Sequence, residues 1–252
     1  MKHPGIQGLL ASYPRTRPEL PPAQRARYVQ DYRNNRMGAQ GLAAVVAGLE
    51  AWMHRAVAAP PAARRILELG AGTLNHLRYE PEAEVYDVVE PFHELWVDRA
   101  ERGRVGRFYD DIAEVPEAAR YDRIVSIAVL EHLTDLPLVV ARSALHLDEG
   151  GQFRGGIPSE GGFLWGLAWR STTGVVYRLR TGLDYARIMR HEHANQADEI
   201  VAVLGYFFQE VSWRRFPLGV KHLSFYTAIE ARGPRRERCA AFADGRRVLV
   251  PA

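Results

Sequence analysis

The chain has 252 residues, which at about 150 residues per domain favours one large domain or one domain with insertions. Hydrophobic residues at 47% and charged residues at 25% exclude a disordered chain, a collagen-like repeat and a small disulfide scaffold. The 33 Lys and Arg against 30 Asp and Glu give a net charge of +3, and the arginines are spread along the chain. Because no basic stripe forms, we expect no nucleic-acid partner.

Cysteine content and apolar runs indicate the compartment. Cys239 is the single cysteine, so no internal disulfide can form, and no signal-peptide pattern opens the sequence. The longest mostly apolar run, residues 41–53, is interrupted by Glu50 and is shorter than the roughly 20 residues that a membrane span needs. We therefore expect a cytoplasmic protein without a membrane span.

A helical extension is expected over residues 1–62, with one helix over 23–34 and an amphipathic helix over 41–57. After the break at Ala59-Pro60-Pro61, short apolar runs alternate with stretches of helical character. The runs cover residues 66–69, 85–89, 105–109 and 124–129. Alternation of this kind predicts a parallel sheet with crossover helices.

The second half is expected to complete the sheet. Gly150-Gly151 precedes a fifth candidate strand at 152–157, and the strand-like runs 207–214 and 222–230 indicate an antiparallel hairpin at a sheet edge. The main domain is thus expected over 63–232. Within it, residues 159–205 are rich in Trp, Tyr, Arg and His and are predicted to form a helical lid. The Arg-rich end, 233–252, is predicted to be a solvated tail.

The segment from Arg65 to His76 carries the most informative motif. A short apolar strand runs directly into Gly70 and Gly72, where backbone amides can approach a ligand without intervening side chains. Eighteen residues beyond Gly72, Glu90 stands at the end of the second strand. An acid at this place can accept hydrogen bonds from both ribose hydroxyls of an adenosine-containing cofactor.

Two cofactors share this geometry. A nicotinamide dinucleotide would require glycine at Asn75 and usually has an apolar residue where Glu68 stands. The other cofactor is S-adenosylmethionine. The motifs that follow the later strands distinguish between these two cofactors.

Four motifs arrive in order at the ends of the first four predicted strands: Glu68-x-Gly70-x-Gly72, Glu90, Asp111-Ile112 and the run from Ile127 to Leu133. This ordered set resembles the class I S-adenosylmethionine-dependent methyltransferases. The resemblance covers residues 63–158 well and the two late strands loosely. It implies an α/β, doubly wound (Rossmann-like), seven-stranded and mostly parallel sheet. Leu74 departs from it, because many members have a third glycine there, and we expect a shifted loop.

The resemblance also implies a cofactor role for each matching residue. Gly70 and Gly72 would line the methionine part, and Glu90 would hold the ribose. Glu68 would act beneath the cofactor as an indirect organiser. Three further residues would complete the site: Asp111 at the adenine amino group, Ile112 on the adenine ring and Ala128 beside the cofactor. For Asp111 a capping role is the alternative, with Asp110 serving instead.

Histidines are the candidate catalytic residues, because a hydroxyl acceptor benefits from a base with proton affinity near neutral pH. His132 follows the fourth strand, and His193 belongs to Met189-Arg-His-Glu-His193. His191, Glu192 and His193 are also potential metal ligands, although their spacing is not that of a zincin helix. Structural or capping roles remain the alternative for both histidines. We predict catalytic roles for His132 and His193 and no metal.

The predicted lid is the part of the sequence that indicates the methyl acceptor. Its aromatic and arginine side chains suit a polar organic molecule such as a sugar. The sequence after the fourth strand lacks the Asp/Asn-Pro-Pro-aromatic pattern of enzymes that methylate base amino groups. We therefore predict methylation of a polar small molecule or glycan-linked acceptor, at oxygen. The alternatives are a catalytically silent S-adenosylmethionine-binding partner protein and a nicotinamide-dependent oxidoreductase. A homo-oligomer stays open.

Overall fold

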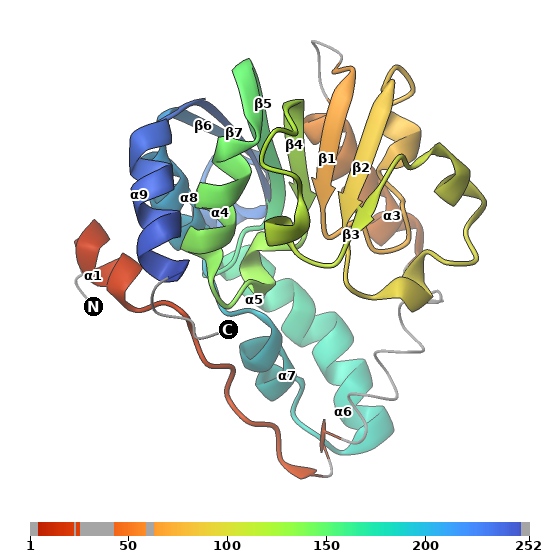
Figure 1. Ribbon diagram of the computed structural model, residues 1–252. Coiled ribbons are helices and arrows are strands. Elements are labelled where there is room, and N and C mark those ends of the chain that lie inside the picture. The colour runs from red at the N-terminus through yellow and green to blue at the C-terminus, as the bar shows by residue number, and fades with distance from the viewer. Residues whose placement is uncertain (1–4, 23, 26–42, 59–62, 248–252) are drawn as a thin grey trace.

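The protein folds around one seven-stranded sheet with the strand order β3-β2-β1-β4-β5-β7-β6, as the computed structural model in Figure 1 shows. The structure describes residues 5–22, 24–25, 43–58 and 63–247. The strands are β1 (Arg65–Leu69), β2 (Val85–Val89), β3 (Phe108–Tyr109), β4 (Tyr121–Ile127), β5 (Leu147–Pro158), β6 (Phe208–Pro217) and β7 (Ser224–Pro234).

The first five strands pair in parallel, whereas β7 runs antiparallel to both of its neighbours, β5 and β6. Strands in the parallel part are apolar on both faces, as in β1, where Ile66 and Leu67 are fully buried. Such runs are typical of parallel sheets covered on both sides. The predicted doubly wound, mostly parallel sheet with an antiparallel edge hairpin is confirmed.

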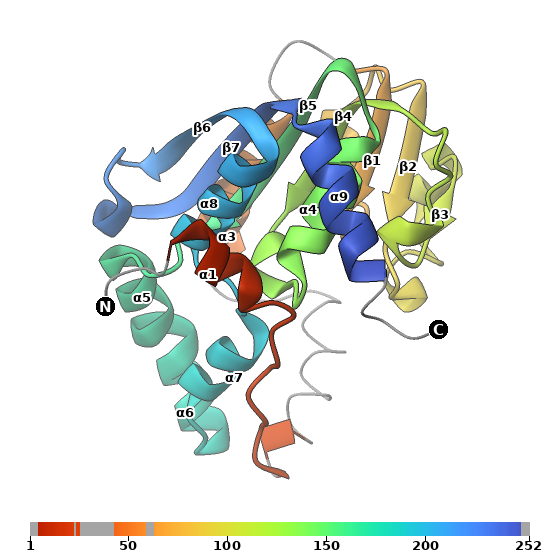
Figure 2. The same ribbon diagram turned by 60° about the vertical axis from the view of Figure 1, so that its left-hand side comes forward.

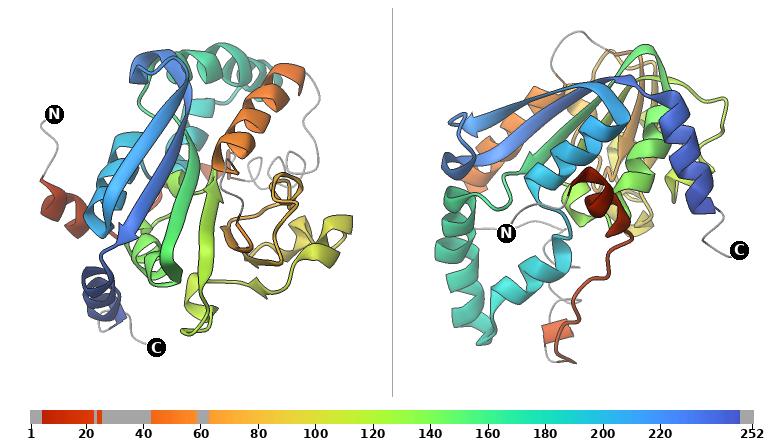
Figure 3. Two further views of the ribbon diagram at one scale, coloured as in Figure 1. Left: turned by 90° about the horizontal axis from the view of Figure 1, so that it is seen from above. Right: turned by 90° about the vertical axis from the view of Figure 1, so that its left-hand side faces the viewer.

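The α-helices are α1 (Ile6–Ala11), α3 (Ala43–Val57), α4 (Leu136–Leu145), α5 (Phe163–Trp169), α6 (Val175–Thr181), α7 (Tyr185–Glu192), α8 (Ala197–Phe207) and α9 (Arg236–Arg247). Helices α4, α8 and α9 cover one face of the sheet, and α3 covers the other, as Figures 1 and 3 show. The main hydrophobic core lies under α4 and α8, and includes Val140, Val203 and Phe153.

The connections among the first four strands differ from the sequence prediction. The predicted crossover helices are wrong here, because turns and short 3-10 segments join these strands. The segments are η1 (Leu77–Tyr79), η2 (His93–Leu95), η3 (Ala100–Arg104) and η4 (Ile112–Glu114). Each 3-10 segment spans five residues or fewer, so it adds little regular backbone hydrogen bonding to that side of the sheet. The glycine loop after β1 therefore opens no α-helix.

Three lid helices, α5, α6 and α7, lie beyond the edge of the sheet at which the parallel strands end (Figure 1). A π-helical segment, η6 (Arg170–Gly174), joins α5 to α6. The predicted lid extended to residue 205, but Ala197 to Phe207 form α8, and Ile200 and Leu204 are buried in the main core. The lid helices therefore end at Glu192.

The two ends of the chain compare differently with the sequence expectations. Arg236–Arg247 form helix α9, which packs on α4 with Cys239 fully buried, so this part is not a solvated tail. The helix predicted over 41–57 is present as α3. The helix predicted over 23–34 lies almost entirely outside the described residues. Figure 2 shows α1 and the segment that follows it running past α8 toward the lid helices.

Candidate active site

The glycine loop after β1 meets the end of β4. Gly70 has φ of +69° and Gly72 has φ of +52°, a left-handed backbone that L side chains rarely adopt. A Cβ placed on Gly70 would lie 2.3 Å from Val129 Cγ2, whereas one on Gly72 would meet nothing within 4 Å. Leu74 also has a positive φ, +62°, and its side chain is buried. The loop thus keeps open space above Gly72 and close packing at Gly70.

Glu90 is held at the end of β2 by two backbone amides. The Gly72 N–H donates to Glu90 Oε2 over 2.8 Å, and the Phe92 N–H donates to Oε1 over 3.0 Å. Only 4% of the residue is exposed. Because each carboxylate oxygen can accept more than one hydrogen bond, Glu90 retains capacity for ligand hydroxyls.

Glu68 lies beneath the loop on β1 and is 2% exposed. Its Oε2 accepts a hydrogen bond of 2.6 Å from the Tyr86 hydroxyl on the neighbouring strand β2. Burial raises the pKa of the Glu68 carboxyl, although the nearby His76 and the bond from Tyr86 oppose that rise. Glu68 therefore joins β1 to β2 under the glycine loop.

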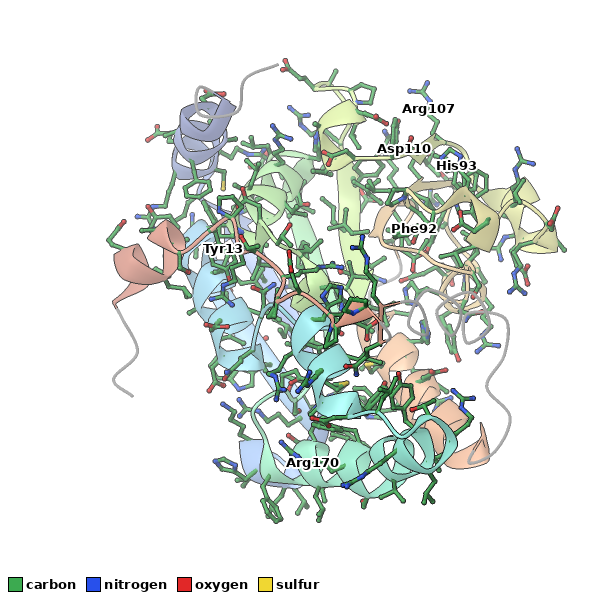
Figure 4. The ribbon with its side chains drawn as sticks, turned by 90° about the horizontal axis from the view of Figure 1, so that it is seen from below. Tyr13, Phe92, His93, Arg107, Asp110 and Arg170 are labelled. Atoms are coloured by element: carbon green, nitrogen blue, oxygen red, sulfur yellow. The ribbon has the colours of Figure 1, made fainter. Side chains whose placement is uncertain are left out.

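The carboxylates after β3 are already engaged. Asp111 Oδ1 accepts a 2.7 Å hydrogen bond from the Ala113 N–H at the start of η4, and lies 3.7 Å from Arg142. Asp110 contacts the His93 ring, with 2.7 Å between Oδ1 and Nε2. The structure thus shows for Asp111 the helix-capping contact that was the alternative to a role at the adenine amino group. Figure 4 shows Asp110 and His93 together with the exposed Phe92.

Ile112 and Ala128 occupy contrasting positions. The Ile112 side chain is 3% exposed within the main core, so it offers no open face on which a ring can stack. Ala128 follows β4, is exposed and has φ of +54°. Its N–H donates to Gly156 O over 2.7 Å, which ties the end of β4 to β5. The structure therefore places Ala128 at the same sheet edge as Gly72 and Glu90, since all three follow parallel strands.

The two candidate catalytic histidines contact each other where the segment after β4 meets the lid helix α7. His132 ends η5 (Leu130–His132) after β4, and His193 follows α7 in the lid. Their rings contact edge to face with centroids 4.8 Å apart. His132 Nδ1 lies 2.9 Å from Glu192 O. Because a carbonyl oxygen can only accept, Nδ1 carries the hydrogen, and a neutral His132 ring has its lone pair on Nε2.

Glu160 anchors His193. Its Oε1 lies 2.5 Å from His193 Nδ1 and also accepts a 2.6 Å hydrogen bond from Trp165 Nε1 on α5. Burial alone would lower the pKa of His193, but the hydrogen bond and charge of Glu160, with Glu131 and Glu192, raise it above its usual value. Glu160 thus stabilises the protonated form of the His193 ring.

Glu131, next to His132, is a further titratable group of this cluster. The residue is 1% exposed, and its Oε2 accepts no hydrogen bond from any described residue. Burial raises the pKa of Glu131 to about 7, against the opposing charge of His193. His132 and His193 were predicted from the sequence as catalytic candidates, whereas Glu131 and Glu160 were not predicted as site residues.

Asn195 fixes the turn that carries Glu131 and His132. Its amide nitrogen Nδ2 donates to Leu130 O and Leu133 O over 2.7 and 2.8 Å, and its backbone N–H donates to Glu131 O. The Tyr13 hydroxyl donates to Asn195 Oδ1 over 2.7 Å. No local sequence signal marks Asn195, because its partners come from η5 and the N-terminal segment.

The potential metal ligands of the lid point to different partners. His191 Nδ1 contacts Pro18 O at 2.7 Å, while His193 contacts Glu160. Across the described ranges, no three His, Cys, Asp or Glu side chains form a group that could hold a metal ion. Among the same residues, no helix has the length and apolar character needed to cross a bilayer.

The strand order and the glycine and acid loops define a class I methyltransferase fold, and solved structures share it. NodS, an N-methyltransferase from Bradyrhizobium japonicum WM9 in complex with S-adenosyl-l-homocysteine, has 16% identity and a TM-score of 0.51, covering 91% of this chain and 97% of that chain. An O-methyltransferase family protein from Burkholderia thailandensis has 15% identity and a TM-score of 0.53, covering 91% and 68%. A S-adenosylmethionine-dependent methyltransferase from Thermotoga maritima has 15% identity and a TM-score of 0.54, covering 81% and 95%.

The chain belongs to the family described as methyltransferase domain, whose model matches residues 42–228. It is a S-adenosylmethionine-dependent methyltransferase, and the resemblance seen in the sequence is confirmed. This assignment argues against the nicotinamide-dependent alternative. A search of curated proteins finds no sequence that matches the chain.

The residues at the sheet edge fit this cofactor. Glu90 is a fixed acceptor suited to ribose hydroxyls, and the space over Gly72 admits a ligand close to the backbone. When bound, S-adenosylmethionine supplies an activated methyl group on a positively charged sulfur. The fit rests on the loops after β1 and β2, because the Asp111 carboxylate and the Ile112 side chain already have structural partners.

Proposed function

We propose that this methyltransferase methylates a hydroxyl oxygen of a polar small molecule or glycan-linked acceptor, with His132 as the base. The carrying observation is the Nδ1 contact of His132 with Glu192 O, which assigns the lone pair of a neutral ring to Nε2. A hydroxyl nucleophile must lose its proton as it attacks, and Nε2 is the atom that would receive it. A base of this kind favours oxygen over a neutral amine.

In this proposal His193 orients the acceptor. Its ring packs against His132, and Glu160 stabilises the protonated ring, whose positive charge would lie beside the base. That charge can bind an acceptor oxygen and stabilise negative charge that builds on it during attack. Trp165 and Asn195 would position the pair, one through Glu160 and the other through the η5 turn.

We place the cofactor over Gly72, with the ribose on Glu90 and with Gly70 and Ala128 at its sides. Glu68 would support this site indirectly through Tyr86. Asp111 would need to add a ligand contact to its capping bond, and Ile112 would contribute through its backbone. The cofactor site and the histidine pair would then share the edge formed by β1, β2 and β4, which is where reacting groups must meet.

The test measures S-adenosylhomocysteine release with a panel of alcohols, sugars and amines as acceptors. His132→Gln should lower kcat by about a hundredfold or more with little change in cofactor affinity, and should remove the low-pH limb of the pH profile, where activity rises as the base loses its proton. The exposed His222→Gln is the matched control and should keep wild-type turnover. Methylation of amines alone, or full activity of the double variant His132→Gln/His193→Gln, would contradict the proposal. Cofactor binding without turnover on any acceptor would favour a silent binding protein.

A further inference from the structure

The outer side of the lid helices carries an unusual share of exposed apolar side chains. Eleven large hydrophobic side chains are exposed in the described part of the chain, and eight of them lie on α5, α6 or the connection between β6 and β7. We call these eight the lid face: Phe163, Leu167, Val175, Val176, Leu179, Leu218, Val220 and Leu223. Soluble surfaces normally scatter such residues singly.

On the helices, the exposed residues follow a helical repeat. Phe163 and Leu167 on α5, and Val175 and Leu179 on α6, are each four residues apart, which places each pair on one side of its own helix. Phe163 is 65% exposed and Leu179 is 83% exposed. Other positions of the same helices face inward, since Tyr177 is buried. The helical segment 163–181 is therefore amphipathic, with an apolar side turned to solvent.

The same segment is positively charged. It contains Arg170, Arg178 and Arg180, all exposed, and neither Asp nor Glu. Figure 4 shows Arg170 on the α5–α6 side of the molecule. Phe and Leu beside arginines, without acidic residues, make the pattern of helices that lie in the headgroup region of a bilayer.

The connection between β6 and β7 extends this surface. Its short helix η7 (Lys221–Leu223) packs against α5. A Cβ on Gly162, at the start of α5, would lie only 2.7 Å from Lys221 O. Leu218, Val220 and Leu223 thus add to the apolar side chains on the helices, whereas the Lys221 ammonium is paired with Asp198.

We propose that the lid face binds the surface of a membrane that contains anionic lipids. The lid helices lie at an outer corner of the molecule, as Figure 3 shows, so a broad surface can reach them. Anionic headgroups complement the arginines, whereas a second copy of the chain would bring arginine against arginine. Trp165 connects the same helix to Glu160 and His193, so the bound membrane would lie next to the histidine pair.

The experiment is flotation of the full chain with vesicles of phosphatidylcholine alone or of phosphatidylcholine mixed with phosphatidylglycerol. We expect binding to the mixed vesicles that weakens with added salt. Phe163→Ser/Leu179→Ser should reduce this binding by about tenfold or more, because both side chains are mostly exposed before binding. Arg178→Gln/Arg180→Gln should reduce binding to the mixed vesicles by about tenfold. Binding to neutral vesicles, which we expect to be weak, should not change.

Controls use side chains away from the lid face. Val97→Ser removes an exposed apolar residue of the connection between β2 and β3, and Arg99→Gln/Arg102→Gln removes two exposed cations there. Both should bind vesicles like the wild type, and circular dichroism would check that every variant folds. Equal binding to neutral and anionic vesicles, or none to either, would overturn the proposal. So would a dimer in sedimentation that Leu179→Ser dissociates while vesicles are not bound.

Discussion

The imidazole rings of His132 and His193 meet edge to face, with their centroids 4.8 Å apart. One ring follows a strand of the sheet and the other follows a helix of the lid, so this contact joins the two parts of the molecule. The lid helices are thereby linked to the sheet edge at which methyl transfer is proposed.

Glu160 should control the charge of His193. Glu160→Gln removes the negative charge and leaves only a weaker, neutral acceptor, so burial, which is the largest influence on the pKa of His193, is opposed less. The pKa of His193 should therefore be lower in the variant than in the wild type. NMR titration of the histidine rings measures this shift directly. The exposed Glu94→Gln serves as the control, and an unchanged titration of His193 in Glu160→Gln would show that Glu160 does not hold it.

Glu90 should determine cofactor affinity. Glu90→Ala removes the acceptor proposed for the ribose, and we expect calorimetry to show S-adenosylmethionine binding weakened by about tenfold to a hundredfold. Gly72→Val should weaken it as well, because it fills the open space above the loop. Glu94 is a nearby exposed acid, and Glu94→Gln is the control that should bind the cofactor like the wild type. If both site variants bind like the wild type, the cofactor lies elsewhere.

The two loop glycines should differ in their effect on stability. Gly70→Ala brings its Cβ into Val129, so we expect a loss of about 2 kcal/mol or more in the free energy of unfolding. Gly72→Ala meets only the backbone strain of a positive φ and should cost about 1–2 kcal/mol. Chemical denaturation measures both. Adding Val129→Ala should rescue Gly70→Ala in part, and equal losses without rescue would refute the steric explanation.

Sequence reasoning captured the fold where patterns are local. The apolar runs gave β2 over 85–89 and located the other strands, because burial on both faces is visible in composition. It also gave Gly70, Gly72 and Glu90, which the fold brings to one edge. It failed for the crossovers, where segments such as Leu77–Tyr79 form single turns that carry no helical period. It also took α8 as lid and α9 as a tail, although both bury apolar faces.

Site residues were missed wherever a role depends on tertiary contacts. Asn195 and Glu160 carry no motif, and their importance follows from partners that are distant in the sequence. Asp111 was predicted from its position after the third strand, but its capping contact depends on η4, which has no sequence pattern of its own. A sequence shows which residue types follow each strand, whereas the structure shows which of their oxygens and nitrogens already have partners.

Glu131 should make stability depend on pH. Its pKa is raised to about 7 in the folded protein, above the value of about 4.5 of an exposed glutamate, so folding favours the protonated form. The protonated Glu131 therefore makes its full contribution to the free energy of unfolding below about pH 4.5. That contribution is lost as the pH rises through about 7. Glu131→Gln should remove a loss of about 3 kcal/mol across this range. Denaturation from pH 5 to pH 8 tests this, with the exposed Glu149→Gln as control, and parallel pH curves for wild type and Glu131→Gln would contradict it.

Cys239 should report the packing of α9. The thiol is fully buried, and burial raises its pKa to about 11, so little thiolate exists at neutral pH. We expect very slow labelling by a thiol reagent in the native protein and rapid labelling in denaturant. Because Cys239 is the single cysteine, all of the labelling that is measured comes from this thiol. Labelling of the native protein as fast as that of a short cysteine peptide would show that α9 does not stay packed on α4.

The strand connections divide the molecule into a side where helices join the strands and a side, from β1 to β4, where turns and short 3-10 segments join them. Segments with few regular backbone hydrogen bonds open locally at a smaller free energy than packed helices do. The turn-built side is the one that holds Gly72 and Glu90. A ligand entering there needs only a local fluctuation of the chain, while α4, α8 and α9 keep the rest of the molecule intact.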